Sequence, residues 1–215
     1  MTKPTPPGRA RAYHHGHLRD ALIDIALQRL NQAGAWNFTL RELARRAGVS
    51  HAAAYNHFAN KSALLAAVAA RGFELLRERT ARAGRRASRS ARRRLAAIAT
   101  AYIEFGLDHP AHYRLMFGPE LASVKNRFPE LREASEAAFQ VLRGVLQEGQ
   151  AAGEFRRGSI GQQAMASWSL VHGLTMLLID RRLFLPNHQP PVPGRSAEVA
   201  ARILLEGLAA SAPRA

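Results

Sequence analysis

The segment FTLRELARRAGVSHAAAYNHFANK, residues 38–61, constrains the fold more than any other part of the chain. It opens with Thr39 and, three positions later, Glu42, which is the spacing of a capping box. This pattern predicts a helix that begins at Leu40. We expect Gly48 to end the helix, because glycine adopts the left-handed conformation of a helix end without a penalty from a Cβ atom.

A second short helix is predicted directly after this turn. Ser50 is a favourable N-cap residue and indicates a helix over residues 51–58. Two short helices joined by a glycine-containing turn form a helix-turn-helix, and the second helix of such a pair fits the major groove of DNA. Such pairs also occur as plain packing units. Charge and residue choice therefore have to decide between the two interpretations.

The basic charge of the chain lies almost wholly in its first half. Residues 1–94 contain 19 Lys and Arg against 5 Asp and Glu, whereas residues 95–215 contain 12 against 11. A coding bias would explain a preference for arginine over lysine, but not why the excess lies in one half. The distribution favours a polyanion, with nucleic acid as the first candidate, as the partner of the first half.

Helical periodicity runs through the rest of the chain. Pro110 is placed to begin a short helix that extends through Phe117. No alternating strand pattern and no internal repeat is present, so the predicted fold class is all-α, with a helix-turn-helix head and a larger helical body. The other predicted helices cover residues 17–33, 62–79, 95–109, 130–152, 160–183 and 196–208, and the predicted loops cover residues 118–129 and 186–194.

The predicted domain organisation has four parts. They are a flexible basic arm over residues 1–14, the DNA-binding head over 15–79, an Arg-rich linker over 80–94, and the helical body over 95–211. Nine arginines and a single acidic residue, Glu78, lie between residues 77 and 94. This stretch either supplements phosphate binding or forms a solvated helix face and linker, and we favour the second. The arm, with Lys3, Arg9 and Arg11, either enters a minor groove or only solubilises the chain.

Several patterns indicate where the protein resides. The chain has no cysteine, which suits a reducing cytoplasm. Its N-terminus lacks the apolar stretch of a secretory signal. The most apolar segment, residues 164–179, is interrupted by polar residues and glycine, so it is typical of a buried helix rather than a membrane span. The sequence predicts a cytoplasmic protein without membrane contact.

The run Tyr55-x-His57-Phe58-x-Asn60-Lys61, with FTLRELARRA before it, resembles the DNA-binding head of the TetR family of transcriptional regulators. The resemblance covers about residues 13–73. DHPAHYRLMF, residues 108–117, and WSLVHG, residues 168–173, are similar to the WHG-type C-terminal domain of one branch of that family. The chain departs from the common pattern at Ala53 and Ala54, which leave few long side chains for reading bases.

The resemblance implies roles for individual head residues. Arg41, His51 and Tyr55 match positions that reach base edges or the adjacent backbone, and an arginine is able to bind guanine with two hydrogen bonds. Tyr55 and Phe58 have a competing interpretation as core residues, which is the stronger one for Phe58. The positions that match phosphate contacts are Thr39, Ser50, His57 and Lys61.

The resemblance also implies that the body dimerises and binds an effector. Residues 160–183 and 196–208 would pack against their counterparts in a second copy, forming a four-helix bundle. The effector would be a small, lipophilic molecule. The candidate pocket residues are aromatic or apolar side chains of the middle helices: Tyr102, Phe105, Tyr113, Met116, Phe139 and Trp168.

Other chemistry has little support in the sequence. His14, His15 and His17 lack a cysteine or carboxylate at ligand spacing, so we predict no metal site and no cofactor. Trp168 and His172 share a helix face and suggest a buried tryptophan beside a hydrogen-bonded histidine. The body has no glycine-rich phosphate loop and no recognisable catalytic arrangement, which argues against an enzyme.

The resemblance therefore implies a homodimeric repressor that binds a palindromic operator in double-stranded DNA and is released by the effector. Two alternatives stay open. One is a DNA-binding regulator that has no small-molecule effector, and this alternative includes an activator. A fully packed body would favour it. The other is an architectural DNA-coating protein, whose binding would show a steep salt dependence and no preferred site.

Overall fold

The computed structural model describes residues 18–32, 37–87, 89–122, 125–183 and 192–209. The chain divides into two compact units, Met1–Val68 and Ala69–Ala215, and the helix α4 (Lys61–Ala87) contributes residues to both. Each unit is described by itself. Within the described residues there is no strand, only an isolated bridge between Phe155 and Ala209, so the all-α prediction is confirmed.

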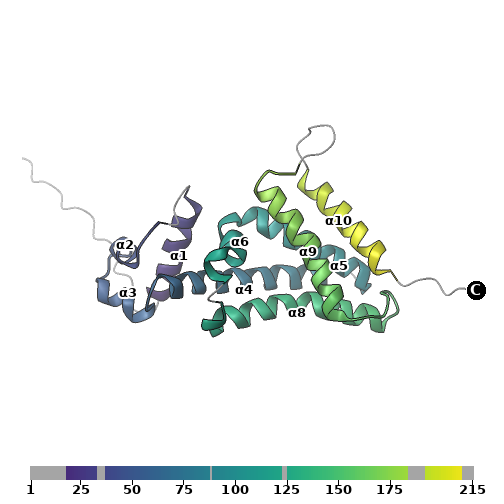
Figure 1. Ribbon diagram of the computed structural model, residues 1–215, viewed down its shortest axis with the longest axis horizontal. Coiled ribbons are helices and arrows are strands. Elements are labelled where there is room, and N and C mark those ends of the chain that lie inside the picture. The colour runs from purple at the N-terminus through teal and green to yellow at the C-terminus, as the bar shows by residue number, and fades with distance from the viewer. Residues whose placement is uncertain (1–17, 33–36, 88, 123–124, 184–191, 210–215) are drawn as a thin grey trace, which may run out of the picture. The chain divides into compact units, whose positions relative to one another are not determined.

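The first unit contains α1 (Leu18–Asn31), α2 (Leu40–Arg46), α3 (His51–His57) and the first residues of α4 (Figure 1). The three short helices pack against one another in every pairing. Burial of apolar side chains from all of these segments drives their assembly. The fully or almost fully buried residues include Leu22, Ile23, Phe38, Leu43, Phe58 and Leu64.

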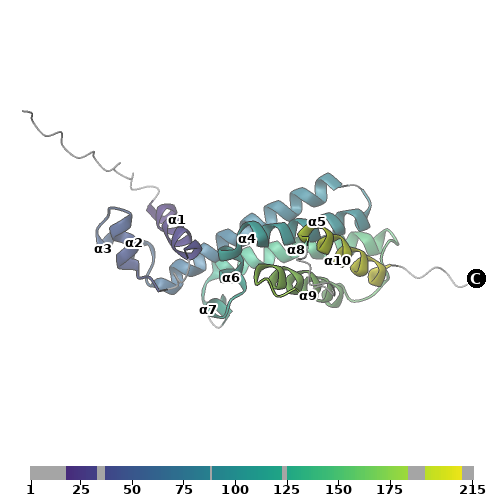
Figure 2. The same cartoon turned by 90° about the horizontal axis from the view of Figure 1, so that it is seen from above.

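The second unit is organised around α5 (Ala91–Asp108). This helix packs against α6 (Pro110–Phe117), α8 (Pro129–Ala151), α9 (Ile160–Ile179) and α10 (Pro193–Leu208). The last two helices lie side by side, as both views show (Figures 1 and 2). Since α5 touches four other helices, its side chains provide much of the core.

Two apolar clusters hold these helices together. One joins the N-terminal half of α5 to α8 and α10, with Leu95, Leu146 and Phe155 near its centre. The other joins the C-terminal half of α5 to α9 and α10 through residues such as Ile103 and Val171. Proline sets the break between α5 and α6, because Pro110 disfavours a helical conformation at His109, which has φ −129° and ψ 54°.

Glu154, in the turn after α8, caps the N-terminus of α5. Its carboxylate accepts hydrogen bonds from the Ser90 hydroxyl (2.7 Å) and from the backbone amides of Ala91 (2.9 Å) and Arg92 (3.1 Å). These bonds lower the pKa of Glu154, because they stabilise the charged carboxylate. The contact ties the end of α8 to the start of α5, although the two residues lie far apart in the sequence.

The helix before the predicted linker, residues 80–94, is longer than the sequence indicated. The helix predicted to end at about residue 79 continues to Ala87, and α5 begins at Ala91, so most of this segment is helical. Leu76, Thr80 and Gly84 form a buried stripe at i, i+4 and i+8, which keeps α4 packed beyond the predicted end. Only one residue of this stripe, Leu76, is large and apolar. The neighbouring arginines dominate the sequence pattern of this segment, so the buried stripe is not evident from it.

Other predicted bounds also shift. The predicted loop 118–129 contains α7 (Pro119–Ala122) and a 3-10 helix, Lys125–Arg127. Helix α9 ends at Ile179 rather than at residue 183, and α10 begins at Pro193 rather than at 196. The helix predicted from residue 110 through 117 has these bounds in the structure. The predicted N-terminal arm lies outside the described residues.

Candidate DNA-binding surface and body cavity

Helix α2 is held at both ends by the predicted residues. The Thr39 hydroxyl accepts a hydrogen bond from the Glu42 amide (3.2 Å), and the Thr39 amide donates to the Glu42 carboxylate (2.9 Å), which completes the capping box. At the other end Gly48 has φ +70°, and the amide of Val49 donates to the carbonyl of Ala44 (3.0 Å). This is a Schellman arrangement, which turns the chain sharply toward α3.

Helix α3 buries one small residue in the core, and most of its other residues are exposed. Ser50 caps it by accepting from the Ala53 amide (3.2 Å), and Ala54 is its buried residue. The small side chain of Ala54 thus forms the buried contact of α3 with the rest of the unit. His51 and Tyr55 are exposed and have ring centroids 4.6 Å apart.

The exposure of Tyr55 separates it from the neighbouring aromatic residue. Tyr55 is 44% exposed, whereas Phe58 is 3% exposed and belongs to the core. Arg41, on α2, is exposed as well, together with Arg45 and Arg46. The three predicted base-reading residues, Arg41, His51 and Tyr55, are therefore all available at the surface of the first unit.

The predicted phosphate-binding residues lie at the ends of α2, α3 and α4. The hydroxyls of Thr39 and Ser50 act as cap acceptors, and each keeps its own proton for donation to a phosphate oxygen. His57 is exposed at the end of α3. The ammonium of Lys61 lies 4.7 Å from the centroid of the Phe38 ring, which holds this side chain over the loop before α2.

Asn60 has a structural role that the sequence interpretation missed. Its side-chain oxygen accepts a hydrogen bond from the Ala63 amide (2.9 Å) and so caps the start of α4. Asparagine directly before a helical apolar stretch is a recognisable N-cap signal, so the sequence contained this information.

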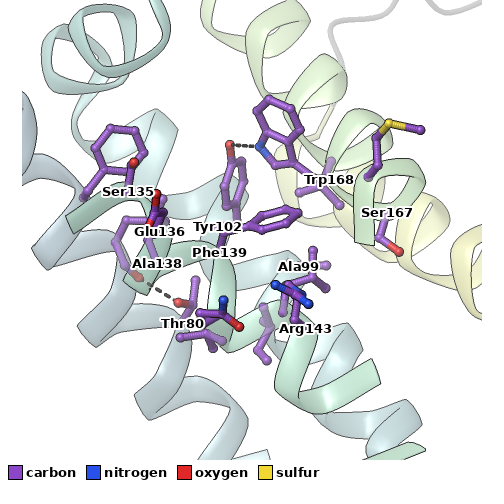
Figure 3. Close-up of a pocket in the computed structure, with 18 of the residues that line it drawn as sticks. Thr80, Ala99, Tyr102, Ser135, Glu136, Ala138, Phe139, Arg143, Ser167 and Trp168 are labelled. Atoms are coloured by element: carbon purple, nitrogen blue, oxygen red, sulfur yellow. Dashed lines mark hydrogen bonds between the residues drawn. The ribbon is translucent and has the colours of Figure 1, made fainter. Parts of the chain in front are cut away.

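The second unit contains a cavity of about 620 Å³ (Figure 3). Its walls come mainly from α4, α5, α8 and α9 and are largely apolar. A cavity of this size and character is typical of small-molecule sites. The apolar residues that line it include Phe73, Leu76, Leu95, Ile98, Phe117, Val171 and Leu204, and the polar ones include Thr80, Ser135, Glu136, Gln140, Arg143 and Ser167.

A group of four polar aromatic side chains lies beside this cavity. The indole of Trp168 donates to the Tyr102 hydroxyl (3.1 Å), as Figure 3 shows, and the Tyr113 hydroxyl also donates to Tyr102 (3.1 Å). The Tyr113 oxygen lies 2.6 Å from Nδ1 of His172. The predicted arrangement of a tryptophan beside a hydrogen-bonded histidine is confirmed, with Trp168 half-buried.

This group carries no charge near neutral pH. Burial raises the pKa of Tyr102 to about 12, and burial is also the main cause that raises the pKa of Tyr113. Burial lowers the pKa of His172, so its imidazole is neutral as well. The group therefore offers hydrogen bonds but no net charge to a neighbouring molecule.

The structure separates the six predicted pocket residues. Tyr102, Met116, Phe139 and Trp168 line the cavity. Tyr113 is fully buried and does not line the cavity. Phe105 is also buried and packs against His109, with ring centroids 5.2 Å apart. The sequence interpretation missed the polar lining residues, because a polar residue on an amphipathic helix gives no sign that it faces a cavity.

Helices α9 and α10 carry large apolar side chains that are exposed. Leu177 is 41% exposed on α9, and Ile203 is 55% exposed on α10. Met165, Leu170 and Val199 on the same two helices are exposed too. Leu170, Leu177, Val199 and Ile203 are the apolar surface of α9 and α10 and lie within the segments predicted to dimerise, whereas Met165 lines the cavity.

The described part of the chain contains neither a metal-binding cluster nor a membrane-spanning helix. No group of three or more His, Cys, Asp or Glu side chains there is placed to hold a metal ion, and His14, His15 and His17 lie outside it. Among the helices of the described residues, none combines the length and the apolar character needed to cross a bilayer.

Two family models match the chain. Residues 22–68 match the model for bacterial regulatory proteins of the tetR family. Residues 95–204, about half of the chain, match the model for the tetracyclin repressor-like C-terminal domain. The first match includes the helix-turn-helix, and the second includes most of the cavity and the apolar surface of α9 and α10.

Individual relatives agree with these matches. The chain is 51% identical over 51 residues to the class C tetracycline repressor protein of Escherichia coli, and 45% identical over 47 residues to the HTH-type transcriptional regulator BetI of Agrobacterium fabrum. These matches cover 24% and 22% of this chain but only 23% of each relative.

The structure is also similar to that of a protein of unknown function from Rhodococcus sp. RHA1. The two are 34% identical with a TM-score of 0.80, over 93% of this chain and 100% of the other. With the helix-turn-helix head and the helical body both matched, the chain belongs to the TetR family and is a DNA-binding transcriptional regulator.

Proposed function

We propose that this regulator is a homodimeric repressor that binds a palindromic operator and is released by a small, lipophilic effector. The observation that carries the effector part is the largely apolar cavity of about 620 Å³ in the second unit. A regulator that is controlled by its abundance alone does not need such a cavity, and a fully packed body would favour that kind of regulator. The presence of the cavity therefore argues against a regulator without an effector.

The exposed residues of α2 and α3 support the DNA-binding roles. Arg41, His51 and Tyr55 would read bases, while Thr39, Ser50, His57 and Lys61 would fix the position on the phosphate backbone. Since each head offers few long side chains for base contacts, tight binding needs two heads on one operator. The apolar surface of α9 and α10 would supply the dimer contact, and a twofold dimer requires a palindromic site.

Release requires that the effector bind one arrangement of the dimer better than the other. Helix α4 offers a route for this coupling, because Lys61 begins the helix and Phe73, Leu76 and Thr80 line the cavity further along it. A ligand that displaces these side chains would act on the helix that also carries a phosphate-binding residue.

The first experiment is selection of randomised duplex DNA by the purified protein near physiological salt, followed by sequencing of the retained DNA. We expect a palindrome with two half-sites. The same protein should bind this site far more tightly than scrambled DNA of equal length. Retention without a motif, with a steep salt dependence, would instead support the architectural alternative.

The sign of regulation has a separate test. A reporter gene placed behind the selected palindrome should be transcribed more strongly when the regulator is deleted. Lower transcription in the deletion strain would identify an activator and would contradict the repressor part of the proposal, while leaving the DNA-binding part intact.

A further inference from the structure

Among the residues that line the cavity, Arg143 is the one with a positive charge. Arg143 lines it from α8, and the Nε atom of this side chain is buried without a hydrogen-bond partner among the residues that the structure describes. Figure 3 labels Arg143 and Ala99 among the side chains that line the cavity. A buried donor without a partner lowers stability, so such groups are rare unless they have a function.

Several other arginines of the body have acidic partners. Arg79 binds Asp108 (2.7 Å) and Glu104 (3.3 Å), and Arg114 binds Asp180 (2.9 Å). Arg94 also has a buried Nε without a partner, but its guanidinium forms an ion pair with Glu148. In the described part of the chain no such ion pair is found for Arg143.

The rest of the lining does not supply an anion to Arg143. The acidic residue among the lining side chains, Glu136, is exposed and lies two helical turns earlier on α8, roughly 10 Å along the axis. Tyr102 and Trp168, at the polar aromatic group, are neutral hydrogen-bonding side chains. Apolar side chains such as Ile98 and Phe139 also line the cavity.

We propose that the effector is a lipophilic carboxylate, whose head group pairs with Arg143 and whose apolar body fills the space toward Tyr102 and Trp168. Arginine presents a planar set of donors that matches a carboxylate and binds it with two hydrogen bonds. The pairing would give the Arg143 guanidinium the anionic partner that it lacks in the described part of the chain. This inference rests on the effector part of the proposed function and specifies the chemistry of the ligand.

The test compares matched ligands that differ only in their charge. Decanoate, decanol and decylamine form one set, and naphthoate, naphthylmethanol and naphthylmethylamine form a second set with a flat body. Binding to the full-length protein is measured by calorimetry below the micelle concentration. In at least one set the carboxylate should bind about tenfold or more tightly than the alcohol, and the amine should bind most weakly.

Two variants connect this preference to Arg143. Arg143→Met keeps an unbranched side chain but removes the charge, and should abolish the preference for the carboxylate while leaving the alcohol affinity within about twofold. Arg132→Met is the matched control, since Arg132 is exposed on the same helix and does not line the cavity. This control should keep the preference.

The unliganded variant provides an independent measurement. Because Arg143 has no partner in the described structure, Arg143→Met should unfold at the same or a higher urea concentration than the wild type. Marked destabilisation would show that the guanidinium has a structural role, and would overturn the proposal. So would equal binding of carboxylate and alcohol, or a preference for the amine.

These outcomes separate the inference from the proposed function. Equal binding of carboxylate and alcohol would overturn the ligand class only, and the effector hypothesis would stand. If no ligand of either set bound while the selected palindrome was still recognised, the carboxylate proposal and the lipophilic effector would both be wrong. Carboxylate binding that left the DNA complex intact would support the ligand class and contradict effector-driven release.

Discussion

At the scale of single residues, the head combines side chains that would recognise sequence with side chains that would hold the backbone. Lys61→Ala should weaken binding to all DNA sequences about equally and should flatten the salt dependence by roughly one phosphate contact. Arg41→Ala should instead relax the preference at one base position in each half-site, at a cost of about 1–3 kcal/mol there. Titration of the selected palindrome and of its single-base variants measures both effects.

The control for these two variants is Arg132→Ala, which removes an exposed positive charge from the body and should change neither property. If Arg41→Ala left every base preference intact, the base-reading role of Arg41 would be wrong. A change of preference in Lys61→Ala would show that this side chain contacts a base.

Glu154 makes a residue-scale prediction about stability. Glu154→Gln should lower the free energy of unfolding at pH 7 by about 1 kcal/mol, because the charged acceptor at the N-terminus of α5 is lost. The pKa of Glu154 is lowered in the folded state, so its stabilising effect is full above the unfolded value of 4.5 and disappears as the pH falls through the folded value. Urea unfolding across this pH range measures it.

The difference between wild type and Glu154→Gln should therefore shrink as the solution becomes acidic. Glu133→Gln is the comparison, since Glu133 is exposed and its contact with Arg132 spans 3.9 Å. That substitution should change the stability by less than about 0.5 kcal/mol. A difference for Glu154→Gln that grew on acidification would contradict the capping role.

At the scale of elements, α8 contains two glycines with opposite expectations. A Cβ atom at Gly149 would lie 2.1 Å from the Phe155 ring and 2.9 Å from the Cβ of Ala91, whereas one at Gly144 would meet nothing within 4 Å. Gly149→Ala should destabilise the protein by about 1–3 kcal/mol despite the better helix propensity of alanine. Gly144→Ala should be neutral or stabilise it by up to about 1 kcal/mol. Thermal unfolding of both variants distinguishes packing from propensity, and equal effects would show that Gly149 tolerates a side chain.

At the scale of the whole molecule, the proposed dimer depends on the apolar surface of α9 and α10. Leu177→Arg and Ile203→Glu each place a charge in this surface, and in a twofold dimer each charge occurs twice. Both variants should sediment as monomers at concentrations where the wild type is a dimer, and both should bind the full palindrome more weakly than the wild type.

Leu75→Glu is the control for this prediction, because Leu75 is an exposed apolar residue on α4. It should leave the sedimentation unchanged. If Leu177→Arg and Ile203→Glu both stayed dimeric, the contact between copies would have to lie on another surface.

How well the sequence predicted the structure depended on how far apart in the sequence the interacting residues lie. Thr39 with Glu42, and Gly48 at the helix end, were predictable because their hydrogen bonds span a few residues and have a fixed spacing. The continuation of α4 beyond residue 79 was not predictable. Its buried stripe includes Thr80 and Gly84, which are polar or small and resemble linker residues. Their burial depends on neighbours such as Ile98, whose side chain lies against Gly84.

The sequence by itself determined the helix-turn-helix, the all-α fold and the concentration of positive charge in the first half, because capping, periodicity and charge are properties of neighbouring residues. Only the tertiary structure decided which aromatic residues line the cavity, that Glu154 caps α5, and that Arg143 has no acidic partner among the described residues. These features depend on helices that are distant in sequence and packed together, and a linear pattern does not specify which side chains meet.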